Sequence, residues 1–194
     1  DALLDDLNAR LGRDANAPVD LVGHSMGGNV AMLYGGVRPQ RVRRLVNLEG
    51  FGLPASNPAQ APGRYAQWLD ETRAVRRGET ELKTYDSPDG VASRLMKTNP
   101  RLPQDKADWL ARQWAQPDAS GRWAILGDPA HKVTSATLYR VEEALAIYRR
   151  ITAPTLSVTA SGDSLAQWWK GRFSLAEYRE RIAQIPQLQE AVVM

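Results

Sequence analysis

The sequence predicts an α/β fold, in which helices pack on a parallel β-sheet and a helical segment interrupts the alternation of strands and helices. Three observations lead to this prediction. A strand, a helix and a second strand follow one another over residues 19–48; helical periodicity without strong strands fills residues 51–151; and the alternation resumes over residues 154–194. A strand–helix–strand unit of this length forms a right-handed crossover, so its strands run parallel.

The first expected element is an amphipathic helix over residues 2–11. Four leucines recur at helical spacing: Leu3, Leu4, Leu7 and Leu11. The opposite face carries polar residues: Asp5, Asp6, Asn8 and Arg10. This spacing is typical of a helix with one apolar stripe.

The sharpest motif of the chain is Val-Asp-Leu-Val-Gly-His-Ser-Met-Gly-Gly at residues 19–28. A short apolar strand ends in the pattern Gly23-x-Ser25-x-Gly27, and a helix begins at about Gly27. This is the nucleophile-elbow pattern, in which a strained strand-to-helix turn projects a serine hydroxyl into open space. Glycines are expected on both sides because a Cβ there would collide with the neighbouring strand or helix. The helix N-terminus would help to hold developing negative charge.

The helix after the elbow is expected to end near Pro39, and a second apolar strand follows at 44–48. Beyond it, residues 52–62 are rich in Pro, Ala and Asn and indicate an irregular connection. Helices are then predicted over four ranges: 64–77, 88–97, 104–116 and 137–150. Such a helical block inside a strand–helix alternation indicates an inserted cap.

Four tryptophans lie within this block: Trp68, Trp109, Trp114 and Trp123. We expect most of them to anchor the core between cap helices, and one or two could line a substrate pocket. After the cap, a strand at 154–160 leads into the polar turn Ser-Gly-Asp-Ser at 161–164. A helix over about 174–184 and a final apolar strand from residue 191 follow. The expected parts are therefore 1–50 (core with elbow), 51–151 (cap) and 152–194 (core).

Composition narrows the possible functions. The 194 residues are 43% hydrophobic and 24% charged, as in ordinary globular domains. No apolar run approaches the roughly 18 residues of a membrane span. The sequence has no cysteine, which excludes disulfides, thiolate metal sites and a cysteine nucleophile. The net charge of +3 comes from scattered arginines offset by acids, so no nucleic-acid partner is expected. The absence of cysteine and of a visible leader favours a bacterial cytoplasm.

The order of strand, Gly-His-Ser-Met-Gly-Gly turn, helix, strand, helical insert, strand, Ser-Gly-Asp turn, helix and strand resembles the second half of the α/β-hydrolase superfamily fold. In the family's scheme the strands look like the fifth to eighth, with the cap between the sixth and seventh. The resemblance implies a serine hydrolase that cleaves a carboxylic ester or related acyl bond of a small, partly apolar substrate. Thioester and carbon–carbon bond hydrolysis use the same constellation. It implies no metal and no organic cofactor.

The resemblance also assigns roles to single residues. Ser25 matches the nucleophile, and the backbone N–H of Met26 matches one of two oxyanion donors. Asp163, in the context Pro-x5-Ala-x-Gly-Asp, matches the usual triad acid, and Glu49 is a rival because some members place the acid after the sixth strand. Asp163 could instead bond its own backbone in the turn, and Glu49 could pair with a cap arginine. The candidate substrate-binding residues are His24, Trp68 and Trp109.

The chain departs from the family pattern at the catalytic histidine, which the family places in a loop after the eighth strand. His24 lies within the elbow, where the turn directs its side chain away from the triad, and His131 lies at the end of the cap. We therefore expect the chain to be a fragment of a longer hydrolase and inactive alone, because losing a triad histidine costs on the order of 10⁶ in turnover. The alternative is a non-catalytic hydrolase-fold protein that uses its pocket to bind a ligand.

The family's strand order has one further implication. The strands present here form a contiguous half of the sheet, so the strand at 19–23 becomes an exposed apolar edge. Such an edge favours aggregation or pairing with another chain.

Overall fold

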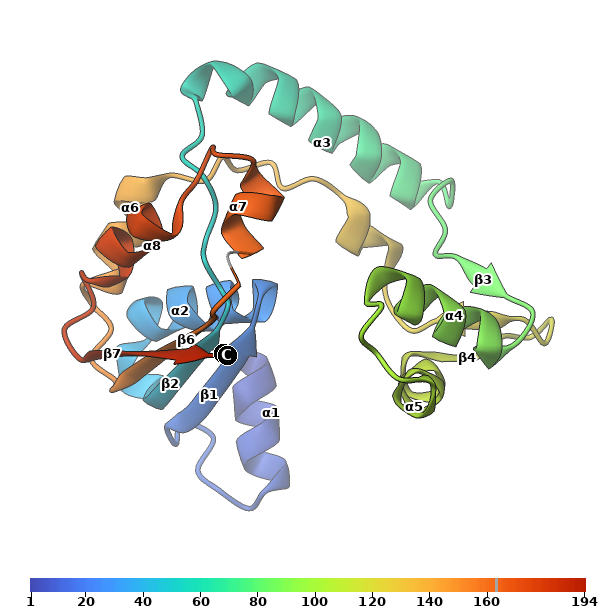
Figure 1. Ribbon diagram of the computed structural model, residues 1–194, viewed down its shortest axis with the longest axis horizontal. Coiled ribbons are helices and arrows are strands. Elements are labelled where there is room, and N and C mark those ends of the chain that lie inside the picture. The colour runs from blue at the N-terminus through green and yellow to red at the C-terminus, as the bar shows by residue number, and fades with distance from the viewer. Residues whose placement is uncertain (163) are drawn as a thin grey trace. The chain divides into compact units, whose positions relative to one another are not determined.

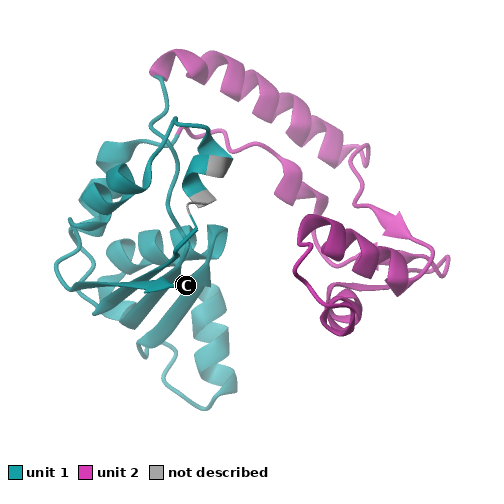
Figure 2. Cartoon of the chain, viewed as in Figure 1, with its two compact units in different colours: residues 1–57, 139–194 teal, residues 58–138 magenta. Residues whose placement is uncertain are grey.

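The computed structural model describes residues 1–162 and 164–194 and divides into two compact units (Figures 1 and 2). Unit 1 comprises Asp1–Asn57 and Tyr139–Met194, and unit 2 comprises Pro58–Leu138. Each unit has a hydrophobic cluster of its own. The predicted α/β architecture is present in unit 1, and it is this unit that positions the candidate site.

Unit 1 contains a four-stranded sheet in the order β1–β2–β6–β7, and all neighbouring strands in it are parallel. The strands are β1 (Val19–His24), β2 (Val42–Leu48), β6 (Thr155–Ala160) and β7 (Leu188–Val193). The register pairs His24 with Leu48, and Leu48 with Val158. The segments that follow β1, β2 and β6 therefore leave the same edge of the sheet, which is where open α/β sheets bind ligands.

Five α-helices of unit 1 accompany the sheet: α1 (Ala2–Arg10), α2 (Met26–Val37), α6 (Val141–Tyr148), α7 (Ser164–Trp169) and α8 (Leu175–Ile182). Helix α2 packs against β1, β2 and α6, and α6 contacts α8 (Figure 1). The core joins Met32 of α2, Leu45 of β2 and Ile182 of α8. A short 3₁₀ helix, η1 (Pro39–Arg41), leads into β2.

The predicted N-terminal helix is present as α1, but three of the four leucines of its stripe face solvent and Leu4 is half-buried. Leu3 is 80% exposed, and Leu7 and Leu11 are exposed too. The polar face is the attached one: Asn8 is fully buried, and its Nδ2 donates to the carbonyls of Ala15 (3.1 Å) and Ala17 (2.9 Å). Hydrogen bonds and ion pairs hold this helix in place, although its sequence is amphipathic.

Polar contacts also join α1 to the segment before β2. Arg41 Nη2 donates to Asp5 Oδ1 at 2.7 Å, and Arg38 Nε donates to Asp1 Oδ2 at 2.9 Å. Tyr34 Oη lies 2.6 Å from Asp1 Oδ1. Acidic side chains at the N-cap and in the first turn of α1 therefore pair with groups at the end of α2 and in η1.

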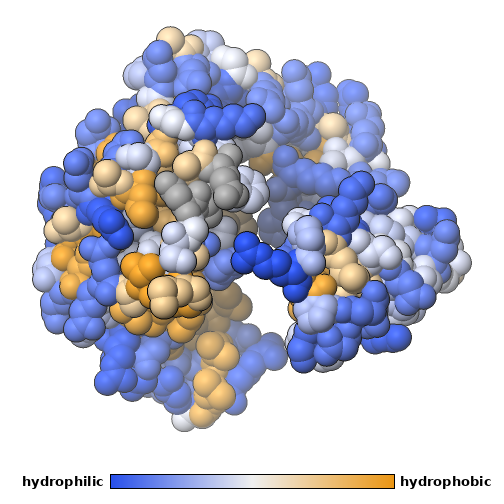
Figure 3. All heavy atoms as spheres, viewed as in Figure 1, coloured by the Kyte–Doolittle hydropathy of each residue, from blue (hydrophilic) through white to orange (hydrophobic). Residues whose placement is uncertain are grey.

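Strand β1 lies at one end of the sheet, as expected from the strand order. The side chain of Val22 in this strand is 68% exposed. Figure 3 shows several apolar patches on the surface of unit 1. Pairing of this edge with another chain stays a prediction.

Unit 2 contains the helices α3 (Ala61–Arg76), α4 (Pro88–Thr98) and α5 (Gln104–Trp114), with 3₁₀ turns η2 (Pro58–Gln60) and η3 (Pro129–Lys132). Its core is built largely from small side chains on α4 and α5. A three-stranded antiparallel sheet was not predicted; it has the order β3–β5–β4, formed by Thr84–Tyr85, Trp123–Ile125 and Ala115–Pro117. These strands are two or three residues long, too short to produce a period-two pattern.

The compact units divide between residues 57 and 58 and between 138 and 139, inside the 51–151 range predicted for the cap. Helix α6 accordingly packs in the core of unit 1, where Tyr148 is buried. The expectation that the cap tryptophans anchor its core was wrong for three of the four. Trp68, Trp109 and Trp114 are exposed, and Trp123 packs against the core of unit 2. No helix in the described residues has the length and apolar character needed to cross a membrane.

Candidate active site

Ser25 connects β1 to α2 in a conformation that L-residues seldom adopt, with φ 52° and ψ −118°. Its backbone is held on both sides. The N–H donates to the carbonyl of Leu48 on β2 at 2.8 Å, and its carbonyl accepts from Asn29 N–H at 3.1 Å. The side chain is exposed and lines a cavity. This is the strained strand-to-helix turn that the motif predicts.

The elbow depends on two glycines, of which one was predicted. A Cβ on Gly23 would lie 2.3 Å from the carbonyl oxygen of Gly27, so Gly23 is required as expected. A Cβ on Gly27 would have no described atom within 4 Å, so the expected collision there was wrong. The close approach falls on Gly28 instead, where a Cβ would lie 2.2 Å from Asn47 Oδ1. In the first turn of α2, Gly28 faces the strands of the sheet and Gly27 does not.

A buried polar network fixes the turn after β2. Asn47 Oδ1 accepts from Gly50 N–H at 2.9 Å, and Asn47 Nδ2 donates to Gly50 O at 2.8 Å and to Tyr178 Oη at 3.0 Å. The hydroxyls of Tyr178 and Ser157 are 2.7 Å apart. Burial raises the pKa of Tyr178. This network was not predicted from the sequence, although Asn47 is a polar residue inside an apolar strand.

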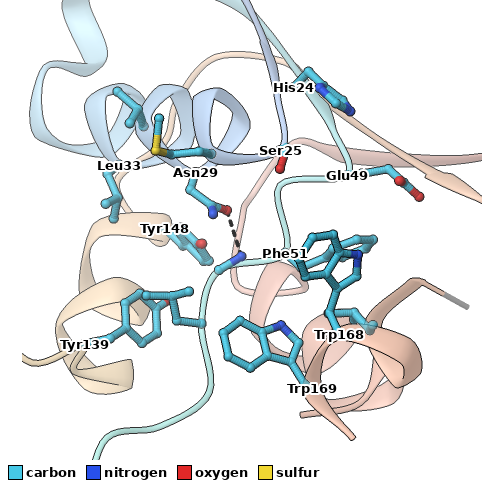
Figure 4. Close-up of a pocket in the computed structure, with 15 residues that line it drawn as sticks. His24, Ser25, Asn29, Leu33, Glu49, Phe51, Tyr139, Tyr148, Trp168 and Trp169 are labelled. Carbon is cyan, nitrogen blue, oxygen red and sulfur yellow. Dashed lines mark hydrogen bonds between the residues drawn. The ribbon is translucent and has the colours of Figure 1, made fainter. Parts of the chain in front are cut away.

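Glu49 lies in that turn with φ 54°, another conformation that is rare outside glycine. Its N–H donates to Val158 O, and its Oε1 accepts from Ala160 N–H, both at 2.9 Å. Among the described residues of unit 1, no arginine forms an ion pair with Glu49. Glu49 and Ser25 line the same cavity (Figure 4).

Asp163, the favoured triad acid, lies outside the described residues, so its role stays a prediction. Met26 is the first residue of α2. The N–H of a first helical residue has no acceptor within the helix, which leaves it available for an oxyanion. The orphan amides and the helix dipole favour negative charge at this position.

Among the described residues of unit 1, no histidine is placed as a partner of the Ser25 hydroxyl. His24 ends β1 and lines the cavity, and its ring is turned away from that hydroxyl (Figure 4). His131 lies in η3 of unit 2. Within the described residues, no group of three or more His, Cys, Asp or Glu side chains could hold a metal ion.

The cavity beside Ser25 has a volume of about 650 Å³, which is within the range of small-molecule sites. Its apolar lining includes Leu33, Phe51, Leu165, Trp168 and Trp169. All the residues that line it belong to unit 1. Trp168 and Trp169 were not predicted to line a pocket, although two adjacent tryptophans soon after the Ser-Gly-Asp turn are visible in the sequence.

Trp68 and Trp109, which were predicted to bind substrate, lie in α3 and α5 of unit 2. They are not among the residues that line this cavity. Their role stays a prediction.

Several solved structures are similar to the chain at low sequence identity. A hypothetical protein from Pseudomonas aeruginosa has a TM-score of 0.75 and 21% identity, over 96% of this chain and 62% of that protein. The thioesterase domain from the curacin biosynthetic pathway has a TM-score of 0.72 and 19% identity, over 98% and 64%. E-2-(acetamidomethylene)succinate hydrolase has a TM-score of 0.62 and 21% identity, over 96% and 61%.

The chain thus spans less than two thirds of the length of these structures, between 61% and 64%. No curated protein matches it by sequence. A family model described as the alpha/beta hydrolase fold matches residues 2–192. Together with the parallel sheet and the strained Ser25 turn, this match shows that the chain belongs to the α/β-hydrolase family.

Proposed function

We propose that this protein is a serine hydrolase that cleaves a carboxylic ester or a related acyl bond of a small, partly apolar substrate. The observation that carries the proposal is the conformation of Ser25. Its backbone is strained at φ 52°, it is held between Leu48 and Asn29, and its side chain opens into a cavity at the N-terminus of α2. Backbone strain persists only where the surrounding structure enforces it, and it concentrates at functional sites.

In the proposed reaction, Ser25 Oγ attacks the acyl carbon while its proton passes to an imidazole base. The alcohol or thiol leaves with that proton, and water then releases the acid and regenerates the serine. The Met26 N–H donates to the oxyanion; removing one such donor typically costs about 10² to 10³ in turnover. Asp163 orients the imidazole, with Glu49 as the alternative acid.

Replacing each candidate acid by its amide distinguishes Asp163 from Glu49 as the triad acid. Asp163→Asn should reduce kcat by about 10⁴, the effect of presenting the wrong imidazole tautomer. Glu49→Gln keeps a carbonyl oxygen that can still accept from Ala160 N–H, so its loss should stay under about tenfold if Asp163 is the acid. A larger loss of kcat in Glu49→Gln than in Asp163→Asn would indicate that Glu49 is the triad acid.

The proposal extends to the base. The ring of His24 turns away from Ser25 (Figure 4), and the family pattern places the catalytic histidine in a loop after the eighth strand, so we propose that neither His24 nor His131 supplies the base. Residues 1–194 alone should then show no turnover, since loss of a triad histidine costs on the order of 10⁶. Turnover by these residues that disappears in Ser25→Ala would contradict this extension and leave Ser25 as the nucleophile.

Hydrolysis of short-chain p-nitrophenyl esters tests the activity in the product of the complete open reading frame. Ser25→Ala should abolish release of p-nitrophenolate. Ser93→Ala, an exposed serine on α4 in unit 2, is the matched control and should retain full activity. Equal activity in the wild type and Ser25→Ala would reject the proposal. A folded wild-type product without turnover would favour the non-catalytic ligand-binding alternative.

A further inference from the structure

Unit 2 (magenta in Figure 2) contains a cavity whose lining is dominated by cationic side chains. Its volume of about 700 Å³ is within the range of small-molecule sites. The walls come from the segment before β3, from α4, from β5 and from η3. No Asp or Glu is among the described residues that line it, whereas four cations are: Lys83, Arg94, Lys97 and Lys132.

Lysine is rare in this chain, which makes its concentration at one cavity informative. The sequence has five lysines and 20 arginines. Three of the five lysines line this cavity, although they come from three separate segments of unit 2. The ammonium group of lysine is a compact point charge that suits phosphate, whereas the planar fork of arginine also suits flat carboxylates.

Three of the four cations are oriented by neutral groups. Lys132 Nζ donates to the carbonyl oxygen of Glu81 at 2.6 Å, and Arg94 Nη1 donates to Tyr85 Oη at 3.0 Å. Lys83 Nζ lies 5.2 Å from the centre of the Tyr85 ring, within the range of a cation–π contact. Because Tyr85 is buried in the core of unit 2, it anchors two of these cations beside the cavity.

Among the described residues of unit 2, no carboxylate forms an ion pair with any of these four cations. Other cations of the unit have such partners. Arg122 Nη1 lies 2.9 Å from Asp86 Oδ1, and Lys106 Nζ lies 3.8 Å from Asp105 Oδ2. Like charges that converge on one hollow repel one another, and the concave surface concentrates their field. A bound anion would relieve this repulsion.

The end of α4 explains only part of the cluster. Arg94 and Lys97 lie three residues apart near the C-terminus of this helix, so they share one face. Cations in that position interact favourably with the helix dipole. Lys83 and Lys132 belong to other segments, and the dipole of α4 does not account for their presence at the same cavity. A single anionic ligand accounts for all four positions.

The remaining lining restricts the size and the chemistry of that ligand. Leu82 and Ile125 are half-buried and place a small apolar surface beside the charges. A phosphate monoester carries nearly two negative charges and three terminal oxygens, so several cations can contact it at once. A carboxylate offers one charge and two oxygens. Four cations beside a small apolar surface therefore fit a phosphate group on a compact organic body.

We propose that the cavity of unit 2 binds a small, soluble phosphate ester, whose phosphate is held by the four cations of the lining. This inference goes beyond the proposed function, because it assigns a second binding site whose occupation does not require Ser25 to react. The same phosphate chemistry occurs in lipid headgroups. The volume of the cavity and its small apolar surface favour a soluble ester, and the experiment separates the two sources.

Two probes of the same shape test the site in the product of the complete open reading frame. Phenyl phosphate carries nearly two negative charges at pH 8, and phenyl sulfate carries one. Titration calorimetry should give phenyl phosphate a dissociation constant at least about fivefold lower, the effect of one further charge at an exposed pair. Added NaCl should weaken phenyl phosphate more than phenyl sulfate, since salt screens the larger charge more.

Substitutions of exposed lysines make the result specific. Lys97→Gln should weaken phenyl phosphate by about fivefold, and Lys97→Glu by at least about 25-fold. Lys106→Gln is the matched control, because it removes the same charge from α5 of unit 2 at a position that does not line the cavity. This variant and Ser25→Ala should leave both dissociation constants unchanged. Near-ultraviolet circular dichroism confirms that each variant keeps its tertiary fold.

Equal weakening by Lys97→Gln and Lys106→Gln would overturn the inference, because net charge alone would then attract the ligand. Absence of phenyl phosphate binding, or equal binding of phenyl sulfate, would overturn it too. Cosedimentation with phosphatidylcholine vesicles that contain phosphatidic acid tests the lipid source. Vesicle binding that is lost in Lys97→Glu would assign the phosphate to a lipid headgroup and contradict the soluble ester. Phenyl phosphate binding that depends on Lys97, without vesicle binding, supports the proposal.

Discussion

At the scale of single residues, the conformation of Ser25 follows from how little room its neighbours leave. The strand before it and the helix after it approach so closely that Gly23 and Gly28 admit no Cβ. The Asn47 side chain fills the space beside Gly28 and also holds Gly50. The elbow is thus enforced by backbone contact and one buried amide.

Gly28→Ala and Gly27→Ala form a matched pair that tests this packing. Gly28→Ala places a methyl group 2.2 Å from Asn47 Oδ1 and should lower the free energy of unfolding by about 1–3 kcal/mol, as overpacking does. Gly27→Ala meets no described atom and should leave stability unchanged or raise it by about 0.5–1 kcal/mol, because alanine loses less backbone entropy in a helix. Urea denaturation measures both. Equal effects would contradict the assigned geometry.

The buried tyrosines predict a pH dependence of stability in alkaline solution. Burial raises the pKa of Tyr148 and Tyr178 above the ordinary value of 10.0. Their stabilising effect is complete below pH 10 and is lost as the pH rises above it, because the unfolded chain releases protons that the folded chain retains. Each such group contributes a slope of about −1.4 kcal/mol per pH unit.

Tyr148→Phe should therefore make the decline of the unfolding free energy above pH 10 shallower by about 1.4 kcal/mol per pH unit, the contribution of one titrating group. Urea denaturation at a series of pH values from 8 to 11 measures this, with Tyr65→Phe as the exposed control. An unchanged slope in Tyr148→Phe would show that the hydroxyl titrates alike in the folded and unfolded states.

At the scale of elements, the sequence predicts well those structures that are fixed by local contacts. The strand, elbow, helix and strand of residues 19–48 are present because apolar periodicity and glycine requirements act over a few residues. Helix α6 has the same kind of periodicity as the cap helices, and nothing local shows that Tyr148 is buried in the core of unit 1. The short strand Trp123–Ile125 pairs with two others in a sheet of unit 2 that periodicity cannot reveal.

The same distinction between local contacts and tertiary packing applies to the residues of the candidate site. Ser25, Met26 and His24 are found from one motif, and Glu49 from its place after an apolar strand. Tyr139 and Trp168 come close to them only through the tertiary packing of segments that are far away in the chain. Local pattern therefore indicates the candidate reacting groups, whereas the walls of the cavity require the fold.

Helix α1 provides a further test, because its buried residue Asn8 is polar and its exposed residue Leu3 is apolar. Asn8→Ala removes two hydrogen bonds to the loop at Ala15 and Ala17 and should cost about 1–3 kcal/mol of unfolding free energy. Leu3→Ala removes a side chain that is 80% exposed and should cost under about 0.5 kcal/mol. Thermal or urea unfolding compares them. A larger loss in Leu3→Ala would mean that the leucine stripe is buried in solution.

At the scale of the whole molecule, the sheet of unit 1 ends at β1, whose Val22 is exposed. We propose that residues 1–194 self-associate through this edge, because unpaired strand edges template pairing with another chain. Val22→Lys should shift sedimentation velocity profiles towards the monomer, since a lysine on the edge opposes pairing. Val37→Lys, the same change at the exposed end of α2, is the control. A wild type that sediments as a compact monomer would contradict this proposal.

Unit 1 holds the candidate site, and the proposed chemistry depends on Ser25 being a reactive nucleophile. The most direct measurement is labelling of the complete open-reading-frame product with a fluorophosphonate probe, followed by peptide mass spectrometry. We expect one adduct on Ser25, absent from Ser25→Ala and retained in Ser93→Ala. Absence of any adduct on the folded protein, or an adduct that persists in Ser25→Ala, would contradict the account.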